Sequence, residues 1–146
     1  MNWQKISIER LREYESRKRA LELIPEQIKA LEDKFTSVRS ATTDSIAISD
    51  GTGNKREDAL INNIVMRQEL AGNLSIALKE VSITESELAG LNDTQRLILQ
   101  KFYIERTHGH IEKLCEELHF EKSRVYALKD EALKKFTMSC YGVVEV

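Results

Sequence analysis

The spacing of the apolar residues restricts the fold of this chain more than any other feature, because they recur every three or four positions over two long stretches. Such spacing places apolar side chains along one side of an α-helix that packs against another helix. We therefore predict two long, coiled-coil-like helices. The first series is Tyr14, Leu21, Ile24, Ile28, Leu31, Phe35 and Val38, and the second is Leu60, Ile64, Ala71, Leu74, Leu78, Val81 and Leu88, which Arg67 and Glu85 interrupt.

The only proline of the chain, Pro25, lies within the first series. Proline has no backbone N–H and disturbs the interior of a helix, but it is tolerated in the first turn. We therefore expect either a kink at Pro25 or a new helix that begins there.

Residues 40–54 separate the two series and are small, polar and without periodicity, which indicates a flexible linker. Two helices joined by one linker predict an antiparallel hairpin over residues 1–88. The same spacing also fits helices that meet across a dimer axis, so the sequence leaves both arrangements open.

The third part of the chain, residues 89–138, has shorter predicted helices. Asn92 and Gln95 have the spacing of a capping box, which predicts a helix that begins there and ends at about Ile104. A short helix over residues 111–118, a tight turn over 119–121 and a longer helix over 122–138 complete a helix-turn-helix pattern, and residues 139–146 form a tail. The positions expected to hold the two helices together are Leu114, Cys115, Leu118, Phe120, Val125 and Leu128.

His119 stands in the turn at the position where glycine is most common. A residue with a β-carbon there must adopt a positive φ or change the turn.

The charge balance excludes a general polycation, because 22 Lys and Arg stand against 24 Asp and Glu, with a net charge of −2. Nucleic-acid binding therefore requires a local basic patch. The predicted last helix offers one, since residues 122–136 contain five basic and two acidic side chains. When Val125, Leu128, Ala132 and Phe136 face inward, the exposed candidates for DNA contact are Lys122, Ser123, Arg124, Tyr126, Ala127 and Lys129.

Other functional classes have weaker support in the sequence. Cys115, His119, His108 and His110 match the spacing of no common zinc module, and residues 51–55 lack the Gly-Lys-Ser/Thr ending of a phosphate-binding loop. No catalytic triad or pair of acids stands out. We therefore expect no enzymatic activity, cofactor or metal. Because no apolar run reaches membrane-spanning length and no signal peptide is evident, we expect a cytoplasmic protein.

Residues 91–103, 113–118 and 123–133 resemble region 4 of sigma factors, the domain that contacts the promoter −35 element. With its long helical first half, the chain as a whole resembles the phage late-gene transcription regulators of the ArpU and RinA type. Two features depart from the family pattern. Glu121 stands where Ser or Thr usually begins the recognition helix, and the segment between Tyr103 and Leu114 is longer than usual.

The resemblance implies a sequence-specific DNA-binding transcription regulator of phage or prophage late genes, acting in the bacterial host cell. Its expected partners are double-stranded DNA, a second copy of the chain in a homo-oligomer (a dimer is favoured), and host RNA polymerase. Two alternatives remain open: a DNA-packaging protein similar to the small terminases, and a helical adaptor that binds RNA polymerase without contacting bases.

Overall fold

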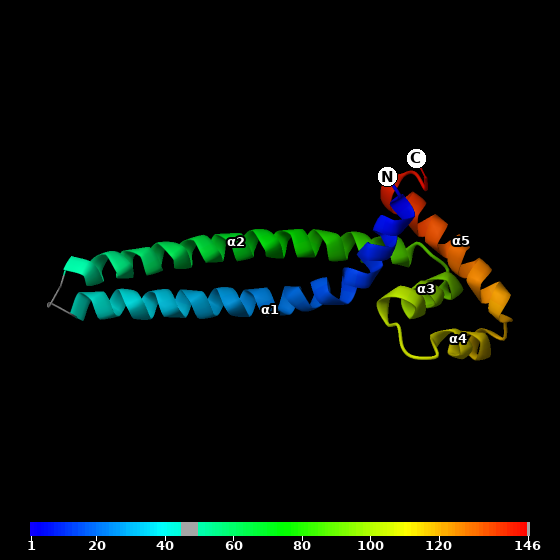
Figure 1. Ribbon diagram of the computed structural model, residues 1–146, viewed down its shortest axis with the longest axis horizontal. Coiled ribbons are helices and arrows are strands. Elements are labelled where there is room, and N and C mark those ends of the chain that lie inside the picture. The colour runs from blue at the N-terminus through cyan, green and yellow to red at the C-terminus, as the bar shows by residue number, and fades with distance from the viewer. Residues whose placement is uncertain (45–49, 146) are drawn as a thin grey trace. The chain divides into compact units, whose positions relative to one another are not determined.

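The computed structural model describes the backbone of residues 1–44 and 50–145, and these residues contain helices and no strands. The prediction of an all-α chain is therefore confirmed. The elements follow one another along the chain (Figure 1). They are α1 (Trp3–Asp44), α2 (Asp50–Ala89), α3 (Asp93–Leu99), the π-helical turn η1 (Gln100–Ile104), α4 (His110–Leu118) and α5 (Lys122–Tyr141).

The described residues divide into two compact units. One, here called the terminal unit, combines Met1–Lys18 with Lys79–Val146; the other, here called the hairpin unit, is Arg19–Leu78. This division differs from the expected boundary near residue 88, because both the start of α1 and the end of α2 belong with the three shorter helices. Sequence periodicity identifies a helix but does not show which part of it packs on which neighbour.

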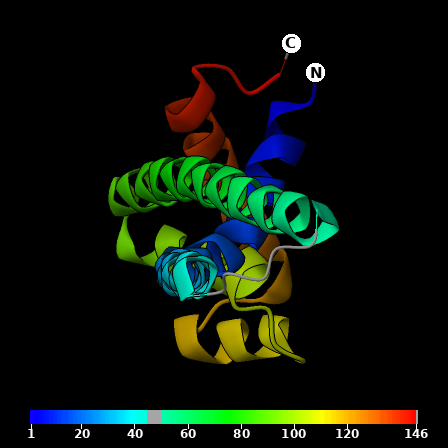
Figure 2. The same cartoon turned by 90° about the vertical axis from the view of Figure 1, so that its left-hand side faces the viewer.

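The main apolar core of the terminal unit joins its first helix to its last. Leu11 of α1 is fully buried, and it belongs to the same cluster as Leu99 of α3 and Phe136 of α5. The first turns of α1 and the last turns of α5 lie side by side (Figure 1 and Figure 2), with the Trp3 and Tyr141 ring centroids 5.0 Å apart. Residues 1–18 are therefore part of this core.

A buried polar contact also joins these two helices. Thr137 Oγ lies 2.7 Å from the Leu133 carbonyl oxygen and 2.8 Å from Ser7 Oγ, and both Ser7 and Thr137 are fully buried. Since a hydroxyl has one proton, Thr137 donates to the carbonyl when Ser7 donates to Thr137. These contacts give both buried hydroxyls a hydrogen-bond partner, and a buried hydroxyl without one would destabilise the core.

The hairpin unit shows which side of each long helix is covered. On α1, Ile24 is buried and Ile28, Leu31, Phe35 and Val38 are half-buried, so the predicted series is confirmed there. On α2 the covered positions include Leu60, Asn63, Arg67, Leu70 and Leu74.

The predicted α2 series is wrong at three positions, because Ile64, Ala71 and Leu78 are exposed. The cause is that two polar residues occupy the covered side. Asn63 Nδ2 donates to the Leu31 carbonyl at 2.8 Å, and Asn63 Oδ1 accepts from Arg67 Nε–H at 2.9 Å. The Arg67 guanidinium carbon lies 5.0 Å from the Phe35 ring centroid. Hydrophobicity alone cannot identify a contact surface that is built around an amide and a guanidinium.

Three helix ends differ from expectation: the end of α1, the start of α2 and the end of α5. α1 is continuous through Pro25, so no new helix begins there. The expected linker at 40–54 is shorter than predicted, because α1 continues to Asp44 and α2 begins at Asp50; residues 45–49 lie outside the described part of the chain. The expected tail at 139–146 also begins later, since α5 ends at Tyr141, with Gly142 as its C-cap at a φ of 75°.

The predicted capping box at the start of α3 is confirmed. Asn92 Oδ1 accepts from the Gln95 backbone N–H at 2.8 Å, and Gln95 Oε1 accepts from the Asn92 N–H at 3.2 Å. Helical structure then continues through η1 to Ile104, which is the expected end. No described helix is long and apolar enough to span a membrane.

Candidate functional site

The site begins with the packing of α4 against α5, which meet at the three-residue turn of His119, Phe120 and Glu121. His119 caps α4 in the left-handed region at a φ of 57°, which is the first of the two alternatives that its place in the turn left open. Leu114 and Val125 are buried in one cluster with Ile98 and Phe102, and Cys115, Leu118 and Leu128 pack against that cluster. These five of the six predicted packing positions therefore join the helices.

Phe120 is the exception. Its side chain is 39% exposed, and the Arg124 guanidinium carbon lies 5.8 Å from its ring centroid. The turn directs this ring outward, and a cation–π contact with Arg124 holds it near the start of α5. Phe120 therefore adds an aromatic surface beside the candidate residues instead of filling the core.

The start of α5 exposes most of the predicted site residues together. Val125, Ala132 and Phe136 are fully buried on one side of this helix, which confirms their expected inward orientation. Because a residue one or two positions away from Val125 points about 100° or 200° away from it, the neighbouring side chains are directed outward. The exposed residues are Lys122, Ser123, Arg124, Tyr126 and Ala127.

Tyr126 is anchored while it is exposed. Its ring makes an edge-on contact with Phe102, at a centroid separation of 5.8 Å. This contact fixes the ring on the surface of the core, so the phenol is available to a ligand at little loss of side-chain entropy.

Lys129 differs from the other five predicted residues, because it is half-buried. Its Nζ lies 2.7 Å from Asp130 Oδ1 and 5.8 Å from the centroids of both the Phe102 and Tyr126 rings. Burial by itself lowers the pKa of Lys129, but the hydrogen bond to Asp130 and the nearby phenols outweigh it, so the pKa is raised. Lys129 therefore stays charged and supports the Tyr126 ring, while Asp130 already neutralises part of its field.

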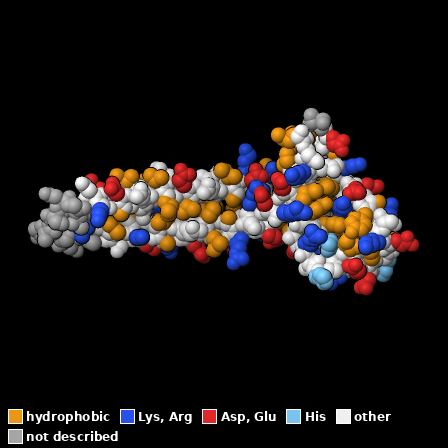
Figure 3. All heavy atoms as spheres, in the orientation of Figure 1, with side chains coloured by type: hydrophobic (Ala, Val, Ile, Leu, Met, Phe, Trp, Pro, Cys, Tyr) orange, Lys and Arg blue, Asp and Glu red, His pale blue; other side chains and the backbone are white. Residues whose placement is uncertain are grey.

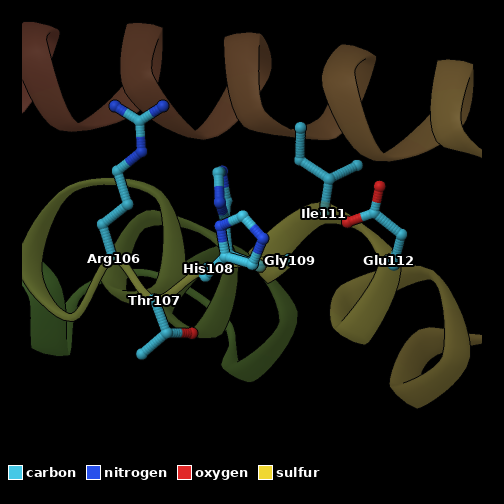
Figure 4. Close-up of a pocket in the computed structure, with 7 residues that line it drawn as sticks. Arg106, Thr107, His108, Gly109, Ile111 and Glu112 are labelled. Carbon is cyan, nitrogen blue, oxygen red and sulfur yellow. The ribbon is translucent and has the colours of Figure 1, made fainter.

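A second basic feature lies where the loop before α4 meets the first turn of that helix, and the sequence-based predictions missed its Arg106. Arg106, His108 and His110 line a surface pocket of about 410 Å³ together with Thr107, Gly109, Ile111 and Glu112. In Figure 4, the Arg106 and Ile111 side chains point to the same side of the loop and Thr107 points to the opposite side. The positive charge of Arg106 in a loop directly before a predicted helix was the signal that could have identified it.

Both helices of this motif begin without a side-chain cap. The N-cap of α4 is Gly109, which has a φ of 73° and no side chain that could accept a hydrogen bond. The N-cap of α5 is Glu121, whose side chain accepts no hydrogen bond from the first turn. The amides of the first turn of α5 therefore remain free of side-chain acceptors beside Lys122 and Arg124. Free first-turn amides and the helix dipole favour an anion at such a position.

Acidic residues limit the positive field around this surface. Glu112, Glu116 and Glu117 are all exposed on α4. Among the described residues, no group of three or more His, Cys, Asp or Glu side chains is arranged to hold a metal ion.

Comparisons with protein-family models, with curated proteins and with solved structures found no match for this chain.

Proposed function

We propose that this chain is a DNA-binding transcription regulator of phage or prophage late genes, in which the start of α5 enters the major groove. One observation carries the proposal: Lys122, Ser123, Arg124, Tyr126 and Ala127 are exposed together on a helix whose opposite side is fully buried. This arrangement supports a rigid recognition helix, because the core fixes its orientation while polar side chains remain available to bases and phosphates. The assignment to late genes rests on the resemblance to the ArpU and RinA type.

The side chains suit different parts of a DNA duplex. Arg124 donates two hydrogen bonds to a guanine edge, which provides about 1–3 kcal/mol of discrimination against other bases. Lys122 binds a phosphate, and the methyl group of Ala127 contacts a thymine methyl. Lys129 positions Tyr126 and is not a direct contact, because it is already paired with Asp130.

The charge balance sets the expected affinity. Residues 92–138 contain nine basic and eight acidic side chains, so one copy makes few favourable phosphate contacts. Weak binding by a single copy follows, with a shallow dependence on salt. We therefore propose that tight binding requires a dimer on two half-sites or contact with host RNA polymerase.

The experiment selects binding sites for the full-length protein from a random duplex pool and then measures affinity by fluorescence anisotropy. Arg124→Ala should reduce the preference for the selected site over random duplex by roughly 10- to 100-fold. Arg124→Lys keeps the charge but loses the two-pronged contact, so we expect it to retain binding to random duplex while losing most of the preference. Lys29→Ala, which removes one exposed lysine from the hairpin unit, is the control and should leave the preference unchanged.

Two results contradict the proposal. If the wild-type protein selects no sequence either alone or with RNA polymerase, or if Arg124→Ala keeps the full preference, then α5 does not contact bases. Retention of RNA polymerase by a protein without DNA preference favours the adaptor alternative, and ring-shaped oligomers that bind a packaging site favour a small-terminase role.

A further inference from the structure

The outward side of α2 is unusual in composition. Ile61, Val65 and Ile76 are 56%, 48% and 62% exposed, although each is strongly apolar. Over residues 59–78 the helix carries two charged residues, Arg67 and Glu69, whereas residues 19–39 of α1 carry eight. Since Arg67 packs on Phe35 at the covered side, Glu69 is the one charge in this stretch that remains for the outward side. Figure 3 shows hydrophobic side chains exposed along the hairpin.

These outward residues form a regular series, here called the outer stripe. Its members lie at three- and four-residue steps along one uninterrupted helix, with Gln68 and Glu69 adjacent at the centre. The series is symmetric about the point between Gln68 and Glu69. The outer stripe consists of Asp58, Ile61, Val65, Gln68, Glu69, Gly72, Ile76 and Lys79.

We propose that a second copy of this chain covers the outer stripe, with the two α2 helices packed antiparallel about a two-fold axis between Gln68 and Glu69. In a two-fold interface, if one residue contacts a second residue of the other copy, then that second residue contacts the first in return, so a series that is symmetric in spacing is complementary to itself. In this register Ile61 lies opposite Ile76 of the second copy.

Size complementarity supports the register. Val65 of one copy lies opposite Gly72 of the other. Gly72 lies inside a 40-residue helix, where glycine costs about 1 kcal/mol relative to alanine. Within one chain a β-carbon at Gly72 would meet nothing within 4 Å, so no described contact requires glycine there. Packing of a branched side chain from an opposing helix does require glycine at this position, because the missing β-carbon lets the two backbones approach closely.

Charge complementarity supports the same register independently. Asp58 lies opposite Lys79 of the second copy, so each end of the stripe gains an ion pair, and Gln68 lies opposite Glu69. Neither Asp58 nor Lys79 forms an ion pair with any other residue that the structure describes. A parallel pairing would place Asp58 against Asp58 and Lys79 against Lys79, which disfavours that orientation.

The test is the oligomeric state of the full-length protein, measured by sedimentation equilibrium. We expect a dimer, and Val65→Glu should raise its dissociation constant by at least about 100-fold, because the pairing would bury an unpaired charge. Met66→Glu is the matched control, since Met66 is 55% exposed but points about 100° away from Val65. It should leave the dissociation constant nearly unchanged.

A charge exchange tests the register. Asp58→Lys and Lys79→Asp, each alone, should raise the dissociation constant roughly tenfold, because each places like charges opposite one another at both ends of the interface. The double variant Asp58→Lys with Lys79→Asp should recover wild-type affinity. Circular dichroism of each variant verifies that the helices are intact.

Three results would overturn the proposal. The first is a wild-type protein that stays monomeric at 100 times the protein concentration used in the DNA-site selection. The others are a dimer whose dissociation constant Val65→Glu does not raise, and a double variant whose dissociation constant stays above that of the wild type. The proposal does not depend on DNA binding, and its readout contains no DNA, so either proposal can fail without the other.

Discussion

The two units of this protein differ in how completely they bury their apolar side chains. In the terminal unit, Leu11, Ile98, Leu99 and Phe136 have no exposed surface, while among the described side chains of the hairpin unit the most deeply buried apolar residues are Ile24 and Ala77, at 8% and 7% exposure. Several helices surround the first core, but each helix of a hairpin has one neighbour, which covers one side. A single chain therefore completes the core of the terminal unit and leaves apolar surface on α2.

The largest expected effect tests whether residues 1–18 complete the core of the terminal unit. A chain of residues 79–146 alone should fail to fold, because it lacks Leu11 and the Ser7 partner of Thr137. A chain in which residues 1–18 are joined to 79–146 by a short Gly-Ser linker should fold. A short linker is sufficient because Arg17 Nη1, near the end of the first segment, lies 3.9 Å from Glu80 Oε2, near the start of the second.

Amide dispersion in a proton–nitrogen correlation spectrum measures both chains. Native dispersion in residues 79–146 alone would show that the first helix is dispensable. That result would favour the boundary near residue 88 that the sequence predicts between the helical hairpin and the shorter helices.

The next effect compares one phenylalanine from each unit. Phe136→Ala should destabilise the terminal unit by about 3–5 kcal/mol, since it opens a cavity in a fully buried core. Phe35→Ala should destabilise the hairpin unit by about 1–2 kcal/mol, because Phe35 is half-buried.

Urea unfolding followed by two signals separates these effects. Trp3, the only tryptophan, lies in the terminal unit, so its fluorescence reports that unit, whereas circular dichroism at 222 nm reports both. Phe136→Ala should lower the fluorescence midpoint, and Phe35→Ala should change the dichroism with little change in fluorescence. Equal shifts of both signals in both variants would mean that the units unfold as one.

The smallest effect concerns Cys140, which packs against the core of the terminal unit. Burial raises the pKa of the Cys140 thiol to about 11, from an ordinary value of 9.0. Because the unfolded chain releases this proton at lower pH than the folded chain, folding stability should fall as the pH rises from about 9 to about 11. Below pH 9 the thiol is protonated in both states and contributes no pH dependence.

Urea midpoints of the wild-type protein and Cys140→Ala, measured from pH 8 to 11, isolate this contribution from other titrating groups. The difference between the two proteins should be constant below pH 9 and should shift against the wild type above it. A constant difference throughout would show that the thiol is as accessible to water in the folded chain as in the unfolded one.

Local patterns in the sequence predicted much of the site. The capping box of Asn92 and Gln95, the ends of α4 and the start of α5 were predictable because short-range hydrogen bonds and turn residues determine them. Val125 and Phe136 were predictable as buried residues because they recur at helical spacing. The exposure of Phe120 and the pairing of Lys129 with Asp130 were not predictable, since both depend on where neighbouring rings lie.

By itself, the sequence determined that the chain is helical, where α3, α4 and α5 begin, and which residues the start of α5 exposes. Only the tertiary structure decided that Leu11 shares a core with Phe136, and that the covered side of α2 contains Asn63 and leaves Ile64 and Leu78 exposed. The physical reason is range. Helix formation depends on residues three and four positions apart, whereas the choice of a packing partner depends on residues far apart in the sequence, such as Leu31 with Asn63 and Leu11 with Phe136, which no local pattern records.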